Sequence, residues 1–425
     1  MRSKIFNSPL AERPTRRAGT LATELFQRPK LGFLYVLSVP LAAGVATVKE
    51  FGVAGINYTG LIWLFFLGVG LLLVFTEKAV HRDRPAAFPW AIWLAWFGWV
   101  WLSLLWCDVV DGRAVQDATQ ITMPLLVGIA ASLFVRSEKQ LRSLLVCFAV
   151  TLLLLILSTT ADRVGLFESD PRVMGITAAL IGCTFITGWP TRWVGPIAGW
   201  AACILLTVAT GSRMATLALL LVPILHPGYR SLLVRTTVML LTAGLGVGLF
   251  YTPVLQQRFF YEGSGTLAQL FQGDFLGFGR FDAWPIIWEE AWQRPFLGAG
   301  VSSTFRYVPT VWDEMTHVHN DYLKIGFEFG LVGLAIFLLV VLCQIIALKL
   351  RMRASQGTLR HAYAAGLLGV LIFLVVAATD NPLVYNLWFM NPLFALIGAA
   401  YGVDRYGARR EPTAISISSW ERRRT

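Results

Sequence analysis

Long apolar segments with almost no charged residues recur along the chain and limit the folds that it can adopt. Most of the runs are roughly 17 to 25 residues long, the length of helix that crosses the hydrocarbon core of a bilayer, and the run at 213–225 is shorter and could be broken or tilted. Backbone hydrogen bonds inside a bilayer must be satisfied internally, so these runs predict α-helices. We therefore expect an all-α polytopic membrane protein with about twelve transmembrane helices. The predicted spans are 31–48, 56–75, 88–107, 117–135, 141–159, 173–188, 193–209, 213–225, 233–250, 322–348, 362–379 and 384–402.

The composition excludes a water-soluble enzyme. Hydrophobic residues make up 56% of the 425 residues and charged residues only 14%, whereas soluble domains carry about a quarter charged residues. The five cysteines form no close pair and have no metal-type spacing. Neither a disulfide framework nor a Cys-based zinc site is therefore expected.

Most of the 36 Lys and Arg residues lie on one side of the alternating connections. The positive-inside rule then places both termini in the cytoplasm, and residues 1–30 have no signal-peptide pattern. The basic charge faces anionic lipid headgroups, so the net charge of +11 does not indicate a nucleic-acid partner. The expected organisation is a cytoplasmic tail (1–30), spans one to nine (31–250), a large outer loop (251–321), spans ten to twelve (322–402) and a cytoplasmic tail (403–425).

The outer loop 251–321 contains too many aromatic residues for a solvated linker. Within it, Trp284, Trp288 and Trp292 recur with Ile287 at helical spacing, which predicts an amphipathic helix at 282–293. Tryptophans on one helix face favour the membrane interface. We expect this helix to lie there and to close over membrane-embedded substrates.

Two of the five histidines stand at the end of the outer loop, directly before the span 322–348. Asn320 or Asp321 is a good N-cap for that helix. The positive end of a helix dipole favours a neutral imidazole, and a neutral imidazole can act as a general base. His319 is thus a candidate catalytic base with His317 beside it, although a histidine that merely precedes a helix would give the same pattern.

A metal site is an alternative for the same segment. His317 and His319 would supply two ligands, and the third would be Asp313, Glu314 or Asp321. The outer acid pair Glu168 and Asp170 matches the paired acids of metal-dependent transferases only weakly and is more typical of a solvated loop. We expect neither a metal nor another cofactor.

Two arginines are candidates for holding an anionic substrate. Arg213 follows Gly211 and Ser212 at the start of a span, where Ser212 can cap the helix and backbone N–H groups with a guanidinium favour phosphate. Arg280 leads into the Trp-bearing helix. Either side chain could instead be an arginine reaching the membrane interface. Asp380 and Asn381, in the outer turn between the last two spans, are placed to orient a partner by hydrogen bonds.

These residues resemble the signatures of the O-antigen ligase and polymerase superfamily. The resemblance rests on the His319-Asn320-Asp321-Tyr322-Leu323 segment followed by Glu328-Phe329-Gly330-Leu331-Val332-Gly333, on the Arg280-x-x-x-Trp284 segment followed by Pro295-x-x-Gly298-x-Gly300, and on the Thr210-Gly211-Ser212-Arg213 turn. Together the motifs cover residues 210 to 333. They occur in the order and on the side of the membrane that the superfamily shows.

The resemblance implies a GT-C-type glycosyltransferase of the Gram-negative inner membrane with a periplasmic active site. A ligase of this kind moves O-antigen from undecaprenyl pyrophosphate to lipid A-core, without metal and with inversion. Arg213 and Arg280 would hold the pyrophosphate, and His319 would be the base. His317, Asn320 and Trp284 would contribute to substrate binding.

Other functions remain open from the sequence. A polymerase of the same superfamily, or a relative that moves glycan onto protein, shares the donor chemistry and differs in the acceptor. A transporter would be expected to carry broken or charged helices at mid-membrane depth, and the spans contain almost no ionisable residue away from their ends. The sugar, the acceptor hydroxyl, the oligomeric state and the control of glycan length cannot be read from the sequence.

Overall fold

The computed structural model describes residues 29–48, 52–53, 56–76, 89–188, 194–229, 231–277, 279–313 and 315–408. The predicted cytoplasmic tails lie largely outside these residues. Twelve helices coincide with the twelve predicted spans: α2 (Pro29–Val45), α3 (Tyr58–Thr76), α5 (Trp90–Leu102), α6 (Gly112–Phe134), α7 (Glu138–Arg163), α8 (Pro171–Ile186), α9 (Val194–Ala209), α10 (Arg213–Ile224), α11 (Leu232–Phe250), α16 (Asp321–Ala354), α17 (Gly357–Val376) and α18 (Met390–Ala408).

Six of these helices, α3, α6, α7, α11, α16 and α17, are long and apolar enough to cross a membrane, and α2, α5, α8, α9 and α10 are shorter apolar helices. The short strands β1 (Gly52–Val53) and β2 (Ile56–Asn57) form a small antiparallel hairpin, and η1 (Ser103–Leu105) extends α5. The fold class predicted from the sequence, an all-α polytopic membrane protein, is confirmed.

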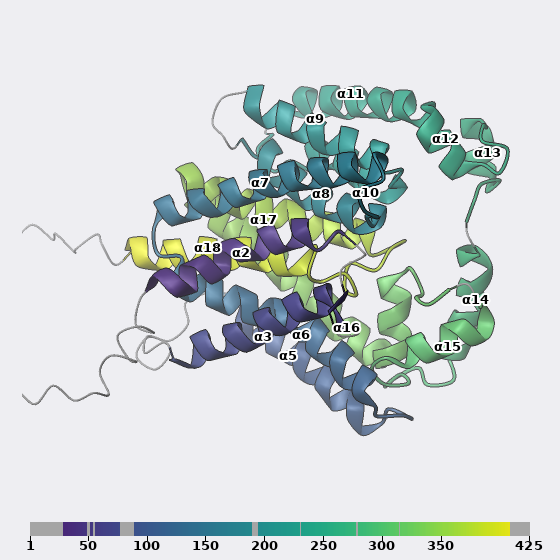
Figure 1. The fold of residues 1–425 in the computed structure, drawn as a ribbon, viewed down its shortest axis with the longest axis horizontal. Coiled ribbons are helices and arrows are strands. Elements are labelled where there is room, and N and C mark those ends of the chain that lie inside the picture. The colour runs from purple at the N-terminus through teal and green to yellow at the C-terminus, as the bar shows by residue number, and fades with distance from the viewer. Residues whose placement is uncertain are drawn as a thin grey trace, which may run out of the picture.

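The centre of the bundle packs through small residues. Helices α6 and α18 come so close that a Cβ on Gly398 would lie 2.1 Å from the carbonyl oxygen of Gly128. Small residues allow such backbone approach between helices inside a bilayer. Figure 1 shows α2 beside α18, so that the first and last described helices are neighbours.

The outer loop folds into four short helices: α12 (Pro253–Phe259), α13 (Leu267–Gln272), α14 (Arg280–Ala291) and α15 (Ser303–Val311). Figure 1 shows α14 and α15 at one end of the bundle, opposite the end at which α18 finishes. A second apolar core lies beneath them and includes Ala283, Ile287, Val318 and Phe327. This core packs α14 and α15 against the beginning of α16.

The helix predicted at 282–293 is therefore found, but its buried face differs from the predicted tryptophan stripe. Ala283 and Ile287 are fully buried against the protein, whereas Trp288 and Trp292 are exposed. The two exposed rings meet edge to face with 5.6 Å between their centroids. The tryptophans at 288 and 292 thus point away from the core that anchors the helix.

Helix α16 is broken at Gly330, where φ is 66° and ψ is −175°. The loop 295–300 enters the break and replaces the lost helical hydrogen bonds. The amide of Leu331 donates to the carbonyl of Pro295 at 2.7 Å, and the amide of Ala299 donates to the carbonyl of Phe327 at 2.8 Å. Backbone groups that lose their helical partners in a buried position need such hydrogen bonds. The Pro-x-x-Gly-x-Gly segment at 295–300 and Gly330 therefore form one structural unit, which we call the joint.

Candidate active site

His319 lies in the segment that leads into α16 and adopts an unusual backbone conformation. Its φ of 52° lies in the left-handed region, which costs a non-glycine residue about 1 kcal/mol or more and often marks a functional site. The residue is only 8% exposed. Its ring faces the turn between α17 and α18, where Nδ1 lies 3.1 Å from Nδ2 of Asn381 and 3.7 Å from Oδ1 of Asp380. The conformation turns the imidazole toward these two residues.

The surroundings of Nδ1 determine which ring nitrogen can accept a proton. Asn381 is fully buried, and its Oδ1 has no hydrogen-bond partner among the described residues. A half-turn of the Asn381 amide exchanges Nδ2 for Oδ1, which then accepts a proton from Nδ1. The nearby carboxylate of Asp380 favours the same tautomer. With the proton on Nδ1, the lone pair of Nε2 is available as a base.

Electrostatics around His319 keep its ring neutral and keep Asp380 charged. Burial lowers the pKa of His319, and the charges of Arg172 and Arg280 lower it further, whereas Asp380 raises it. Burial alone would raise the pKa of Asp380, but its contact with His319 and the charge of Arg172 outweigh burial and lower it. A neutral imidazole beside a fixed carboxylate can take up a proton and be stabilised as imidazolium.

Two arginines flank this pair. Arg280, the first residue of α14, donates from Nη1 to the carbonyl of Thr379 at 2.8 Å. Arg172, near the start of α8, donates from Nη1 to the hydroxyl of Tyr385 at 3.0 Å, and its Nε lies 4.0 Å from Asp380. The turn after α17 therefore holds the histidine and both guanidinium groups together.

Arg213 reaches the same region from the first position of α10. Its Nη1 donates to the carbonyl of Leu276 at 2.8 Å, and its guanidinium lies 5.1 Å from the centre of the Phe259 ring. It is close enough to Arg280 and Arg258 for the charges to repel one another. Positive charges held close together favour an anion that neutralises them.

The predicted cap by Ser212 is wrong. Ser212 stands at the N-cap position of α10, but its side chain makes no cap hydrogen bond. Only its carbonyl participates, accepting from the amide of Thr216 at 3.0 Å. The hydroxyl instead packs against α8, since a Cβ on Gly175 would lie 2.4 Å from it. Packing between α8 and α10 therefore determines its orientation.

Asn320 and Trp284 hold the histidine segment in place. Asn320 is the N-cap of α16, and its side chain accepts from the amide of Leu323 at 3.0 Å, as the sequence predicted. The indole of Trp284 donates to the carbonyl of Val318 at 2.7 Å, so α14 is tied to the residue directly before His319. A role of either side chain in substrate binding stays a prediction.

His317 faces a different small cavity, which Arg113, Phe305 and Lys324 also line. The centroid of its ring is 6.4 Å from that of His319. Burial and, to a smaller extent, the charge of Lys324 lower the pKa of His317 to about 3. His317 is therefore neutral, and it lies beside the base rather than in contact with Asp380.

A buried charged pair inside α16 was not anticipated from the sequence. Nζ of Lys324 lies 2.5 Å from Oε1 of Glu328, and the hydroxyl of Thr304 on α15 donates to the same oxygen. Both charged residues are nearly inaccessible. The pair links α15 to the helix that follows the histidine, and the signal was a Lys and a Glu four residues apart on one helix face.

The acid pair Glu168 and Asp170 does not form a metal-binding cluster. Asp170 is the N-cap of α8 and accepts from the amide of Arg172 at 2.9 Å, which fits the solvated-loop interpretation. Within the described ranges, no three His, Cys, Asp or Glu side chains come close enough to hold a metal ion. Glu314, one candidate third ligand, lies outside those ranges.

The structure brings together Arg213, Arg280 and His319 from three sequence motifs and adds Arg172 and Tyr385, which sequence reasoning missed. Arg172 was one of several outer arginines, and Tyr385 lay within a predicted span. Nothing in the local sequence of either residue indicates that it approaches the histidine. Only the packing of α8 against α17 and the following turn places them there.

Comparison with known protein families agrees with the motifs. Residues 197–338 match the family model described as O-antigen ligase, and the Gly-Ser-Arg, Arg-x-x-x-Trp and histidine motifs all lie in this range. No curated protein matches the chain. Residues 197–338 of this multi-pass membrane protein are therefore similar to the O-antigen ligase family, in agreement with the resemblance that the motifs indicated.

Proposed function

We propose that the protein is an O-antigen ligase of the Gram-negative inner membrane. It transfers O-antigen from undecaprenyl pyrophosphate to lipid A-core at a periplasmic site. The observation that carries the proposal is the meeting of a neutral, carboxylate-oriented His319 with Arg280 and Arg213. Such a site has a base for an attacking hydroxyl and positive charge for a departing pyrophosphate.

The proposed reaction is a single displacement. Nε2 of His319 takes the proton of the acceptor hydroxyl as its oxygen bonds to the anomeric carbon of the donor sugar. The bond from that carbon to the pyrophosphate oxygen breaks at the same time, and the leaving group carries away the electron pair. Arg213 and Arg280 stabilise the charge that develops there. Because attack and departure occur on opposite faces, the anomeric configuration inverts.

Asp380, Asn381 and Arg172 support this step without being the base. Asp380 stabilises the imidazolium that forms on His319, and Oδ1 of Asn381 accepts a hydrogen bond from the Nδ1–H group once its amide has turned. Arg172 lies near Asp380 and keeps that carboxylate ionised. Because these side chains are already held in place, they need to move little when His319 takes up the proton.

Lipopolysaccharide gels of a strain deleted for the gene, complemented with wild type or with His319→Ala, test the proposal. A ligase predicts loss of the whole O-antigen ladder, accumulation of long glycan on the lipid carrier, and no rescue by the variant. Lipid A-core carrying a single repeat unit would indicate a polymerase instead. An unchanged ladder would reject O-antigen transfer and direct attention to glycosylation of protein.

A further inference from the structure

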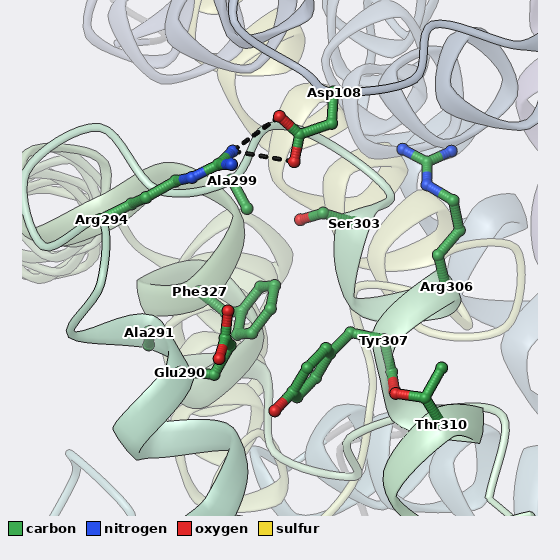
Figure 2. Close-up of a pocket in the computed structure, with 10 residues that line it drawn as sticks. All are labelled: Asp108, Glu290, Ala291, Arg294, Ala299, Ser303, Arg306, Tyr307, Thr310 and Phe327. Atoms are coloured by element: carbon green, nitrogen blue, oxygen red, sulfur yellow. Dashed lines mark hydrogen bonds and ion pairs between the residues drawn. The ribbon is translucent and has the colours of Figure 1, made fainter.

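A second hollow lies at the outer end of the bundle, away from the histidine. Its volume is about 280 Å³. Figure 2 shows side chains around it from the segment after α5, the end of α14, the loop between α14 and α15, α15 and the beginning of α16. His319, Arg280 and Arg213 do not line this pocket. The proposed reaction therefore leaves its purpose unexplained.

The pocket combines an aromatic wall with hydroxyl and carboxylate groups. The rings of Tyr307 and Phe327 lie 5.2 Å apart, tilted by 34°, and Glu290 lies beside them (Figure 2). Ser303 and Thr310 add hydroxyl groups on α15. Pockets that recognise small ligands typically have this composition, with apolar surface and a few placed polar groups.

The cations of the pocket are already paired. Arg294 makes two contacts of 2.9 Å with the carboxylate of Asp108, as Figure 2 shows, and Arg306 lies 3.2 Å from Asp111. Glu290 then leaves the pocket with no excess positive charge. An anionic ligand would have to break an ion pair, whereas a neutral polyhydroxyl ligand would not.

Two polar groups in the pocket make no side-chain hydrogen bond to the described residues, although the charge of Glu290 acts on Arg294. Across the described residues, neither the carboxylate of Glu290 nor the hydroxyl of Tyr307 makes a hydrogen bond. A carboxylate accepts strong hydrogen bonds from ligand hydroxyls. Glu290 is also close enough to raise the pKa of Tyr307, together with the larger effect of burial. Both groups are thus available to a ligand in the pocket.

The base of the pocket is rigid. The amide of Ala299 donates to the carbonyl of Phe327 at 2.8 Å, and the indole of Trp106 donates to the carbonyl of Leu297 at 3.0 Å. These bonds belong to the joint at the break in α16. A preformed pocket loses little conformational freedom when a ligand binds.

The position of the pocket suggests which part of the substrates it meets. Arg280 begins α14 and Glu290 stands near its end, so their backbones are about 15 Å apart along the helix axis. The donor pyrophosphate is assigned to the Arg280 end. In an inverting displacement the acceptor approaches from the face opposite to the leaving group, and we therefore assign the end of α14 away from Arg280 to the acceptor.

We propose that this pocket binds a neutral pyranose unit of the acceptor glycan, some distance from the hydroxyl that reacts. The sugar ring stacks on Tyr307, and its hydroxyls donate to Glu290. The inference rests on the proposed function, because it takes the acceptor to be a glycan. It adds a recognition site that positions the acceptor for attack.

Binding of a glycan probe to the purified protein in nanodiscs tests the pocket directly. The probe is dephosphorylated, lipid-free core oligosaccharide, measured by isothermal titration calorimetry. Glu290→Gln and Tyr307→Ala are expected to weaken binding at least tenfold. Glu289→Gln removes a neighbouring carboxylate that does not line the pocket and is expected to stay within twofold of wild type. His319→Ala is expected to bind the probe normally.

Steady-state kinetics separate this role from a general loss of folding. Glu290→Gln is expected to raise the KM for the acceptor at least tenfold while kcat and the KM for the donor stay within twofold. Absence of probe binding to the wild type, or equal affinities of the two Gln variants, would overturn the proposal. So would a change in the donor KM alone, or displacement of the probe by inorganic phosphate. If His319→Ala transferred glycan normally, the proposed function would be wrong. The binding measurements would still show whether the pocket binds the glycan probe.

Discussion

The joint between the loop 295–300 and the broken α16 predicts a strong effect of one added methyl group. A Cβ on Gly330 would lie 2.2 Å from the carbonyl oxygen of Phe296 and 2.3 Å from its carbon. Both atoms belong to the backbone, so the loop itself must move. Gly326, one turn earlier in the same helix, has no atom within 4 Å of the corresponding position. Gly326→Ala is therefore a matched control for Gly330→Ala.

The magnitude follows from the local geometry. An alanine at φ 66° and ψ −175°, a region that essentially only glycine adopts, costs about 1–3 kcal/mol. Displacing the loop breaks the hydrogen bonds from Leu331 to Pro295 and from Val332 to Phe296, each worth about 1 kcal/mol and more if a buried group is left unpaired. Gly330→Ala should thus destabilise the protein by roughly 3–5 kcal/mol. Gly326→Ala should be neutral or stabilise by up to about 1 kcal/mol.

Thermal unfolding at one fixed heating rate provides the assay, followed through the fluorescence of the 16 tryptophans of the detergent-solubilised protein. Gly330→Ala should unfold several degrees below wild type, and Gly326→Ala at or above it. Equal midpoints for the two variants would show that the loop does not occupy the break, and the reasoning about the joint would be refuted.

Three further predictions concern the site and the pair behind it. Asp380→Asn removes the charge that favours imidazolium, so the pKa of His319 should fall further and the acidic limb of kcat/KM should move to lower pH by roughly one to three units; an unmoved limb in the pH profile would contradict the pairing. Arg280→Lys retains the charge but not the planar fork, so kcat should drop by about 10²-fold or more in single-turnover transfer assays, and near-normal turnover would exclude a geometric role. Glu328→Gln leaves the buried charge of Lys324 without its counter-ion and should destabilise by about 3–5 kcal/mol. The double variant Lys324→Met/Glu328→Leu should recover most of that loss in thermal unfolding, and a further loss would speak against a charge-pair origin.

Hydropathy was sufficient to predict the bundle for two reasons. Each transmembrane helix makes its backbone hydrogen bonds internally, and each apolar run can be recognised in the sequence by its length. All twelve predicted spans coincide with helices, including the short α10. The break at Gly330 was not predicted, since one glycine in an apolar helix is compatible with close packing. The break can be recognised only from the loop 295–300 that enters it. This loop lies about thirty positions earlier in the chain than Gly330.

The site was predictable where its residues begin helices. His319, Arg280 and Arg213 each stand just before or at a helix start, and the predicted topology put all three on the same side of the membrane. Residues that approach from other helices left no local signal, as with Arg172, whose guanidinium meets Tyr385 more than two hundred positions away. Capping was predicted correctly for Asn320. It was wrong for Ser212, because packing between helices determined the side-chain direction.

The most direct test of the account is transfer by the purified protein in nanodiscs, supplied with undecaprenyl-pyrophosphate-linked O-antigen and lipid A-core. The comparison is wild type against His319→Ala, with donor binding measured on the same samples. The account predicts that the variant binds the donor with wild-type affinity and loses at least 10³-fold in single-turnover rate, in line with the loss of a general base. Transfer by His319→Ala at a rate close to wild type, with donor binding intact, would contradict the assignment of His319 as the base.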